Sequence, residues 1–178
     1  MTTKGPAGYA IEPLREDHAE ALAASYARSR RHLERWEPRR GEDFATPERQ
    51  AATIRTALEN DAAGRSASWV LVHGDDVVGR VNLNDVVRGA FDNGNLGYWV
   101  DVHHLRKGLA TWAVAHACEA AYDMGLHRVQ AATLLENGPS QKVLARSDFS
   151  WIGTAPEYLR IDGRWQDHHL FQRIVAPS

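Results

Sequence analysis

Leu96-Gly97-Tyr98-Trp99-Val100 is followed, after four residues, by Leu105-Arg106-Lys107-Gly108-Leu109-Ala110-Thr111. The first segment belongs to a strand expected over residues 95–102, and the second opens a helix expected over residues 107–124. Backbone N–H groups that converge at a helix N-terminus attract anions, because they are unpaired and the helix dipole is positive there. Lys107 adds a positive charge, and Gly108 carries no Cβ where a phosphate would approach. The unit therefore fits an anion-binding turn, but an ordinary strand–helix turn with one glycine explains these residues as well, and the GxGxxG and P-loop patterns are both missing.

The remaining periodicity predicts a single α/β (α+β) domain over residues 1–178, with a mixed, mostly antiparallel sheet of six to seven strands and about four helices on its faces. Thr46 and Pro47 are typical of a helix start, Gly64 of its end, and the dipeptide Asn93-Gly94 of a turn. The other expected helices cover residues 16–31 and 139–146, and the other expected strands cover residues 9–14, 68–73, 77–83, 129–135, 149–153 and 165–174.

Composition narrows the class of protein. The chain has 178 residues, 43% of them hydrophobic and 25% charged, with a formal net charge of −2. This length fits one globular domain, and the charge balance argues against a partner nucleic acid held by bulk electrostatics. Residues 1–6 contain no apolar signal segment, and the longest uncharged apolar stretch, residues 109–118, is half of what a membrane span needs. We therefore expect a cytoplasmic protein with no membrane partner.

Other candidate chemistries find little support in the sequence. The histidine pairs at 103–104 and 168–169 lack a third ligand at suitable spacing, and neighbouring strand residues point to opposite faces, so we expect no metal site. Cys118 is the single cysteine and falls inside a predicted apolar helix face, which indicates a buried small side chain. No GxSxG or Cys–His signature indicates covalent catalysis.

The chain as a whole resembles the GCN5-related N-acetyltransferase (GNAT) superfamily, and within it the RimJ/RimL-like type that acetylates ribosomal-protein N-termini. The N-terminal half fits this resemblance more loosely, through its two helices and the Trp36 region. The resemblance rests on the order and spacing of four segments: residues 96–100, residues 105–111, Glu136-Asn137-Gly138-Pro139-Ser140 with Val143-Leu144 and Phe149, and Glu157-Tyr158-Leu159 with Gly163, Trp165, Asp167-His168 and Leu170-Phe171.

Three positions depart from the family pattern. Leu105 stands where the family usually has Gln or Arg, and Arg106 stands where glycine is frequent. Asp148 replaces the glycine that precedes the aromatic residue, and Asp tolerates a left-handed turn better than most residues. Because backbone N–H groups would hold most of the pyrophosphate, we expect binding to survive.

The resemblance implies that acetyl-CoA is the co-substrate. Its pyrophosphate would lie on the loop and helix start formed by Arg106, Lys107, Gly108, Leu109, Ala110 and Thr111. Its pantetheine arm would pair along the strand from Trp99 to Val102, and Asn137 would hydrogen-bond to that arm. A backbone N–H around Val100 to Val102 would hold the developing oxyanion of the thioester.

The resemblance also implies catalytic roles. Ser140 matches the group that protonates the leaving thiolate, although a hydroxyl at a helix start is equally explained as a cap. Glu157 matches the acidic residue proposed as the base, although a solvated carboxylate at a loop edge explains it equally, and Glu37 is a second candidate. A weak base is enough for an α-amino group, because its pKa is about 7.7–8.0 against about 10.4 for lysine. Trp36, Glu37, Tyr98 and Glu157 are the expected acceptor-binding residues.

The acceptor stays open between alternatives. The favoured partner is a peptide N-terminus, and the alternative is a small amine such as an antibiotic, polyamine or amino-acid derivative. A CoA-binding module without catalysis is a third interpretation. Residues 28–40 hold six arginines, which indicate either recognition of an acidic or ribosomal partner or a solvated helix face. Related enzymes often dimerise, so a homodimer is one expected assembly.

Overall fold

The computed structural model describes residues 2–6 and 8–176, and within them one sheet of eight strands in the order β1-β2-β3-β4-β5-β6-β8-β7. All neighbouring pairs are antiparallel except β5 with β6, which is parallel. The mixed α/β fold is as expected, with a short first strand in addition. The strands are β1 (Thr3–Lys4), β2 (Tyr9–Pro13), β3 (Ala67–His73), β4 (Asp76–Val87), β5 (Asn93–Val100), β6 (Arg128–Leu134), β7 (Ser150–Ile161) and β8 (Arg164–Ile174).

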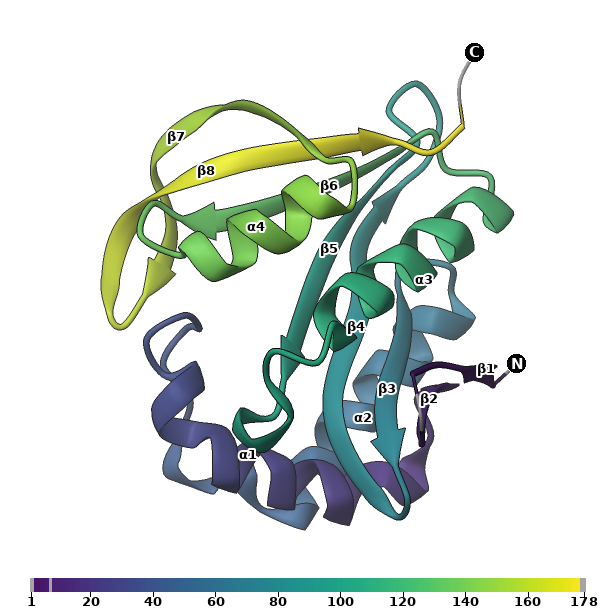
Figure 1. Ribbon diagram of the computed structural model, residues 1–178, viewed down its shortest axis with the longest axis vertical. Coiled ribbons are helices and arrows are strands. Elements are labelled where there is room, and N and C mark those ends of the chain that lie inside the picture. Colours follow the sequence, from purple (N-terminus) through teal and green to yellow (C-terminus); the bar gives the residue numbers. More distant parts are fainter. Residues whose placement is uncertain (1, 7, 177–178) are drawn as a thin grey trace.

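Helices cover both faces of the sheet (Figure 1). Leu22, Tyr26 and Ile54 of the first two helices pack with Val70 and Trp99 on one face. The third helix packs its small residues on the other face, and the fourth contributes its buried leucine there. The helices are α1 (Ala19–Leu33), α2 (Pro47–Ala62), α3 (Leu109–Asp123) and α4 (Gly138–Arg146), and the short 3-10 turns are η1 (Glu16–His18), η2 (Glu42–Ala45) and η3 (Val102–His104).

The helix ends predicted for α2 are confirmed. The Thr46 side chain accepts a hydrogen bond from the Arg49 N–H, Pro47 is the first helical residue, and Gly64 follows with a φ of 69°. This φ lies in the left-handed region, where glycine pays no Cβ penalty. Local chemistry alone therefore fixed both ends of this helix.

Two expected boundaries are wrong. Asn93-Gly94 is not a turn but the start of β5, because Asn93 is buried and a Cβ on Gly94 would lie 3.3 Å from the Leu126 side chain. Gly94 therefore allows β5 to pack closely against the Leu126 side chain. The strand also ends at Val100 rather than residue 102, since the Asp101 carboxylate caps η3 by accepting the His103 N–H.

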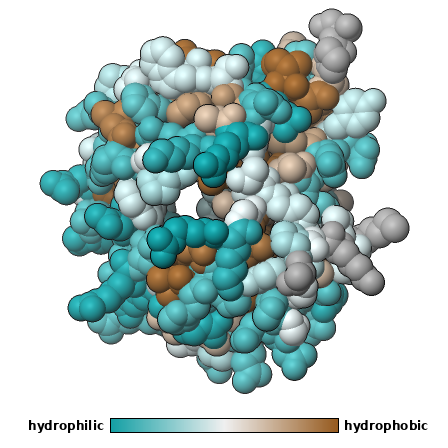
Figure 2. All heavy atoms as spheres, viewed as in Figure 1, coloured by the Kyte–Doolittle hydropathy of each residue, from teal (hydrophilic) through white to brown (hydrophobic). Residues whose placement is uncertain are grey.

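β5 and β6 share only a short stretch of ladder. Their register joins Asn93, Gly94 and Asn95 to residues 128–130, and beyond this point the two strands diverge. Figure 1 shows them separating, and Figure 2 shows the molecular surface hollowed between them. The backbone groups on these facing edges lack a strand partner. This opening is the feature around which the site is built.

An ion pair between a buried carboxylate and a partly exposed arginine fixes the end of β5 to α1. The fully buried Asp101 carboxylate accepts hydrogen bonds from Ser25 Oγ at 2.8 Å and from Arg28 Nε at 3.1 Å, and the Nη2 atom of the same guanidinium lies 3.0 Å away. Ser29 Oγ accepts the Val102 N–H at 3.1 Å. Burial alone would raise the pKa of Asp101, but the hydrogen bonds and the Arg28 charge outweigh it, so the pKa is lowered. We call Ser25, Arg28, Ser29 and Asp101 the α1 clamp.

Loss of the clamp carboxylate is expected to destabilise the fold. Asp101→Ala leaves the buried Ser25 hydroxyl without its acceptor and should cost roughly 1–3 kcal/mol in the free energy of unfolding. Asp76→Ala is the matched control, because Asp76 also pairs with Arg28, at 3.9 Å, but is exposed, so its removal should cost about 0–1 kcal/mol. Urea unfolding measures both. Equal losses would contradict the assigned importance of Asp101.

The same carboxylate predicts a pH dependence. A folded-state pKa that is lowered contributes stability above the unfolded value, about 3.9, and this contribution is lost as the pH falls through the folded pKa. The difference in unfolding free energy between the native chain and Asp101→Asn should therefore be full at neutral pH and shrink below about pH 4. If the difference in unfolding free energy stayed constant down to pH 2, the charge of Asp101 would not be what stabilises the fold.

Candidate active site

The loop before α3 has the backbone shape of an anion site. Arg106 has a φ of 60° and Gly108 a φ of 78°, and both are left-handed. The first helical hydrogen bond runs from the Trp112 N–H to the Gly108 carbonyl, so the N–H groups of Leu109, Ala110 and Thr111 have no acceptor within the helix. A Cβ on Gly108 would meet no atom within 4 Å. The glycine therefore leaves open space in front of these donors.

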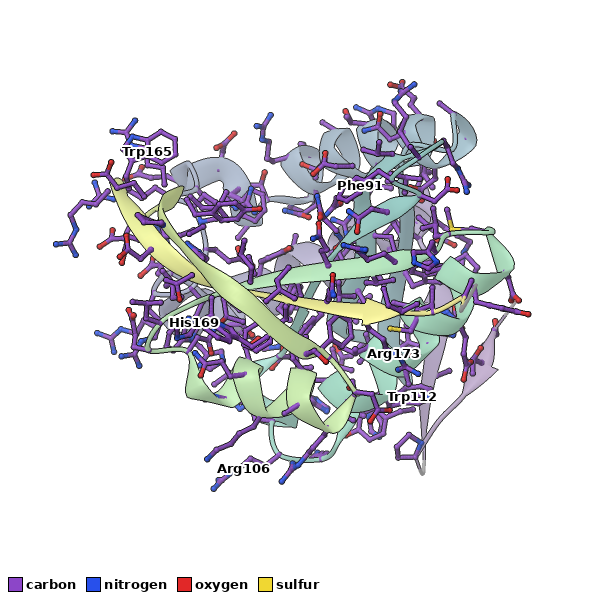
Figure 3. The ribbon with its side chains drawn as sticks, turned by 90° about the horizontal axis from the view of Figure 1, so that it is seen from above. Phe91, Arg106, Trp112, Trp165, His169 and Arg173 are labelled. Carbon is purple, nitrogen blue, oxygen red and sulfur yellow. The ribbon has the colours of Figure 1, made fainter. Side chains whose placement is uncertain are left out.

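The two cations of this loop behave differently. Arg106 is exposed and extends outward from the loop (Figure 3). Lys107 Nζ donates to the Tyr9 hydroxyl at 3.0 Å, and that hydroxyl also bonds to His104 Nδ1 at 2.9 Å. Lys107 is thus held toward β2 by a hydrogen bond that the sequence did not indicate. Both cations stay close enough to the turn to add to its positive potential.

Backbone geometry narrows the oxyanion donor to one candidate. The Asp101 N–H donates to the Val78 carbonyl, and the Val102 N–H donates to Ser29 Oγ. N–H groups alternate in direction along a strand, so the Val100 N–H points away from β4, into the opening beside β6. Val102 therefore has a structural role, and Val100 is the donor left facing the opening.

Side chains of β5 alternate between the two faces. Trp99 packs under α1, with its ring 4.5 Å from that of Tyr26, and is buried. Tyr98 faces α4, where its hydroxyl lies 2.7 Å from Ser140 Oγ and 3.3 Å from the Ser140 carbonyl oxygen. Burial raises the pKa of Tyr98 to about 12. The structure thus brings Tyr98 to Ser140, across the opening between β5 and the β6–α4 connection.

Ser140 is not the cap of α4. That position belongs to Asn137, whose side-chain Oδ1 accepts the Ser140 N–H at 3.2 Å. The Ser140 hydroxyl is therefore available to Tyr98 and to the opening, and the cap interpretation of this residue is wrong. Asn137 keeps its side-chain NH₂ group, which can donate to a ligand.

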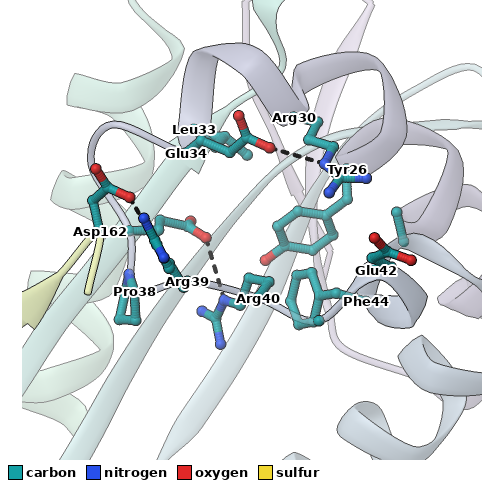
Figure 4. Close-up of a pocket in the computed structure, with 13 residues that line it drawn as sticks. Tyr26, Arg30, Leu33, Glu34, Pro38, Arg39, Arg40, Glu42, Phe44 and Asp162 are labelled. Atoms are coloured by element: carbon teal, nitrogen blue, oxygen red, sulfur yellow. Dashed lines mark hydrogen bonds and ion pairs between the residues drawn. The ribbon is translucent and has the colours of Figure 1, made fainter.

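A pocket of about 270 Å³ lies between the end of α1, the following loop and the tip of the β7–β8 hairpin (Figure 4). Glu37 lines it, and burial, partly offset by Arg40, raises the pKa of this carboxyl group. Tyr26 forms part of the same wall, and burial followed by the Glu37 charge raises its pKa to about 12. The other lining residues are Arg30, Leu33, Glu34, Pro38, Arg39, Arg40, Gly41, Glu42, Phe44, Ala45 and Asp162.

The arginines of residues 28–40 are mostly paired within the chain. Arg28 belongs to the α1 clamp, and Arg39 Nε lies 2.9 Å from Asp162 Oδ1 at the hairpin tip. Figure 4 shows the Arg39 pair together with Arg30–Glu34 at 2.9 Å and Arg40–Glu37 at 3.6 Å. The pocket lining therefore carries three arginines against four acidic residues, which favours a cationic or polar acceptor over an acidic one.

Three of the four expected acceptor residues do not line this pocket: Tyr98, which faces α4, Trp36 and Glu157. Trp36 is half-buried beside it, with the Arg35 guanidinium 5.0 Å above its ring. Glu157 is exposed in an irregular part of β7, where its φ is 47° and its N–H donates to Asp167 Oδ1 at 2.9 Å. The structure thus brings Glu37 into the pocket lining and leaves Trp36, Tyr98 and Glu157 out of it.

Sequence reasoning missed Tyr26 and Arg80. Arg80 lies directly opposite Trp99 in the β4–β5 ladder and so shares its face of the sheet. Arg80 Nε and Trp99 Nε1 are buried and find no acceptor among the residues that the structure describes. Tyr26 could have been found from the helical face that it shares with Leu22. Arg80 gave no such signal, because its place depends on strand register.

The residues set aside in the sequence have ordinary structural partners. Cys118 is buried, and burial raises its pKa to about 11. His168 Nδ1 bonds to the Gln166 carbonyl oxygen, and His169 Nδ1 bonds to Thr154 Oγ1. Within residues 2–6 and 8–176, no cluster of three or more metal-ligating side chains occurs. Over the same residues, none of the helices is long and apolar enough to cross a membrane.

Comparison with known proteins places this geometry in a family. Residues 10–150 match the acetyltransferase (GNAT) domain. The chain is 34% identical over 163 residues to the [ribosomal protein uS5]-alanine N-acetyltransferase of Escherichia coli, covering 90% of this chain and 84% of the relative.

Two solved structures agree in fold over nearly the whole chain. The ribosomal-protein-S5-alanine acetyltransferase of Vibrio fischeri superposes with a TM-score of 0.92 at 30% identity, over 98% of this chain and 96% of that one. Mycobacterium smegmatis RimJ in complex with CoA-disulfide superposes with a TM-score of 0.90 at 30% identity, over 98% and 86%. The chain belongs to the GNAT family and is an acetyl-CoA-dependent N-acetyltransferase.

Proposed function

We propose that this enzyme acetylates the α-amino group of a protein N-terminus. The observation that carries the proposal is the pocket at the end of α1, where the half-buried Glu37 carboxyl group, whose pKa burial raises, lies among three arginines and three other acidic residues. A peptide N-terminus presents an amine next to a carbonyl oxygen, so its amine would lie beside Glu37 while an arginine of the lining donates to its carbonyl oxygen. The uS5-alanine activity of the E. coli relative points to the same class of acceptor.

The chain's own residues suit a direct transfer. Acetyl-CoA supplies the acetyl thioester and the leaving thiol. We propose that the N–H groups at the start of α3 bind its pyrophosphate, that Asn137 and the edge of β5 hold its pantetheine arm, and that the Val100 N–H stabilises the oxyanion. Ser140 would give a proton to the leaving sulfur. That residues 1–178 form a single domain remains a prediction, and so does the homodimer.

We propose Glu37 as the base. Burial raises the pKa of its carboxyl group toward the working pH, which is where a general base transfers protons best. Its position in the pocket also places it next to an incoming amine. Glu157 matches the family's acidic position but is exposed, so we assign it to the outer wall of the acceptor cleft.

Substitution at Gly108 tests the pyrophosphate site. Gly108→Leu fills the space in front of the α3 N–H groups, and loss of one or two charge-assisted hydrogen bonds, about 1.5–3 kcal/mol each, should weaken acetyl-CoA binding at least tenfold. Gly125→Leu is the matched control at the other end of α3, because Gly125 has a φ of 72° and equally open surroundings. Calorimetry with acetyl-CoA measures both. Equal affinities would place the pyrophosphate elsewhere.

An acceptor panel tests the substrate class. We expect turnover, measured as free CoA thiol, with a peptide that begins with alanine. The same peptide blocked at its N-terminus and carrying a lysine should be inert, and an alkyl amine of matched size without a carbonyl should be poor. Turnover restricted to small amines, or binding of acetyl-CoA without turnover, would contradict the proposal.

The pH dependence of kcat/KM tests the base. Glu37 must be ionised to accept a proton, so activity should fall as the pH drops through its raised pKa. Glu37→Gln should abolish that limb and lower kcat about 100-fold, within the usual 10²–10⁴ of a general base. The limb due to the substrate amine, with a pKa of about 7.7–8.0, should remain. A larger loss in Glu157→Gln than in Glu37→Gln would transfer the role to Glu157.

A further inference from the structure

Tyr98 and Ser140 form a short hydrogen-bonded pair that the proposed function uses only in part. The hydroxyl oxygens lie 2.7 Å apart, and the Ser140 carbonyl oxygen lies 3.3 Å from the same phenol oxygen. Tyr98 lies in β5, and Ser140 is the third residue of α4. The pair therefore spans the opening where the two halves of the sheet separate. Ser140 has no capping duty, because Asn137 supplies the cap.

Two hydrogen arrangements fit these three oxygens. In the first, the Ser140 hydroxyl donates to Tyr98 and the phenol donates to the Ser140 carbonyl oxygen, so every hydrogen is used inside the protein. In the second, the phenol donates to Ser140 Oγ, and the Ser140 hydrogen is free to point into the opening. A small rotation of two O–H bonds converts one into the other, and no heavy atom needs to move.

We infer that Tyr98 is a positioning residue. Its phenol O–H donates a hydrogen bond to Ser140 Oγ while Ser140 transfers its own proton to the leaving sulfur. The inference rests on the role of Ser140 under the proposed function. When the carbon–sulfur bond breaks, the sulfur takes the Ser140 hydrogen, and Oγ becomes electron-rich. The phenol O–H then stabilises that oxygen until the proton that the attacking amine gave up to the base returns to it through water, while Tyr98 keeps its own.

Burial suits Tyr98 to this task. The phenol stays protonated over the working pH range because burial raises its pKa to about 12, so it is a constant donor. The new hydrogen bond exists only while Oγ is charged, and interactions of that kind raise kcat rather than ground-state binding. Losing one such donor costs about 10²–10³ in kcat at an oxyanion site, and we expect a loss toward the lower end here.

The test begins with Tyr98→Phe. We expect kcat to fall about 100-fold, with KM for acetyl-CoA changed less than threefold. Tyr122→Phe, at an exposed tyrosine of α3, is the matched control and should leave kcat unchanged. Ser140→Ala should also lower kcat, and the double variant should lose no more than Ser140→Ala alone, because both act on one oxygen. Full additivity, or a loss confined to KM, would overturn the inference.

A second measurement separates positioning from mere packing. Difluorotyrosine at position 98 keeps the shape but has a more acidic phenol. It should support turnover at low pH and acquire a new fall in kcat as the pH rises through the pKa of the fluorinated phenol, which the native enzyme lacks. A pH profile unchanged from the native one would overturn the inference, even if Tyr98→Phe fails to fold.

The outcomes distinguish this inference from the proposed function. The experiment runs with whichever amine the native enzyme accepts, so a wrong acceptor class does not affect it. A loss in Ser140→Ala with none in Tyr98→Phe would reject the role of Tyr98 alone. An unchanged kcat in Ser140→Ala would reject Ser140 as the proton donor, and the role of Tyr98 with it.

Discussion

The parallel pairing of β5 with β6 stops after three residue pairs, and the rest of the site depends on that divergence. Unpaired backbone groups at a strand edge need partners, and an extended ligand arm laid beside β5 can supply them. The Val100 N–H faces this edge, the free N–H groups of α3 follow a few residues later, and Tyr98 meets Ser140 across the same opening. The early end of the β5–β6 pairing therefore brings together the groups that we propose bind acetyl-CoA.

The divergence is held at both ends by packing of different kinds. At its start, Gly94 lets β5 approach the Leu126 side chain closely. At its far end, the α1 clamp ties Asp101 to Ser25 and Arg28 through a buried charge. A buried carboxylate is tolerated only when its partners are well placed, so the clamp admits one arrangement of the β5 end. The position of the anion-binding turn follows from that arrangement.

The sequence predicted those features that depend on neighbouring residues. The cap and end of α2, the glycine before α3 and the start of α4 follow from local backbone chemistry, and the structure agrees. Asn93-Gly94 misled, because a turn and a tightly packed strand both favour glycine. Arg80 and the contact of Tyr98 with Ser140 were invisible, since strand register and residues 42 apart in the chain determine them. The resemblance indicated Ser140 and Glu157 as catalytic residues. Only the fold shows that the Ser140 hydroxyl has a hydrogen-bond partner in Tyr98, whereas Glu157 is exposed.

The two sides of the site differ in how firmly they are held, and the difference fits their tasks. The Asp101 carboxylate is fully buried and its partner Arg28 is 34% exposed, whereas the Arg39–Asp162 pair, which joins the loop after α1 to the β7–β8 hairpin, is more than half exposed on both side chains. Exposed pairs contribute about 0–1 kcal/mol. The acetyl-CoA side is thus rigid, while the acceptor side is closed by a contact weak enough for a peptide to displace. This difference lets one domain hold the thioester in a fixed position and still admit a peptide N-terminus to the acceptor pocket.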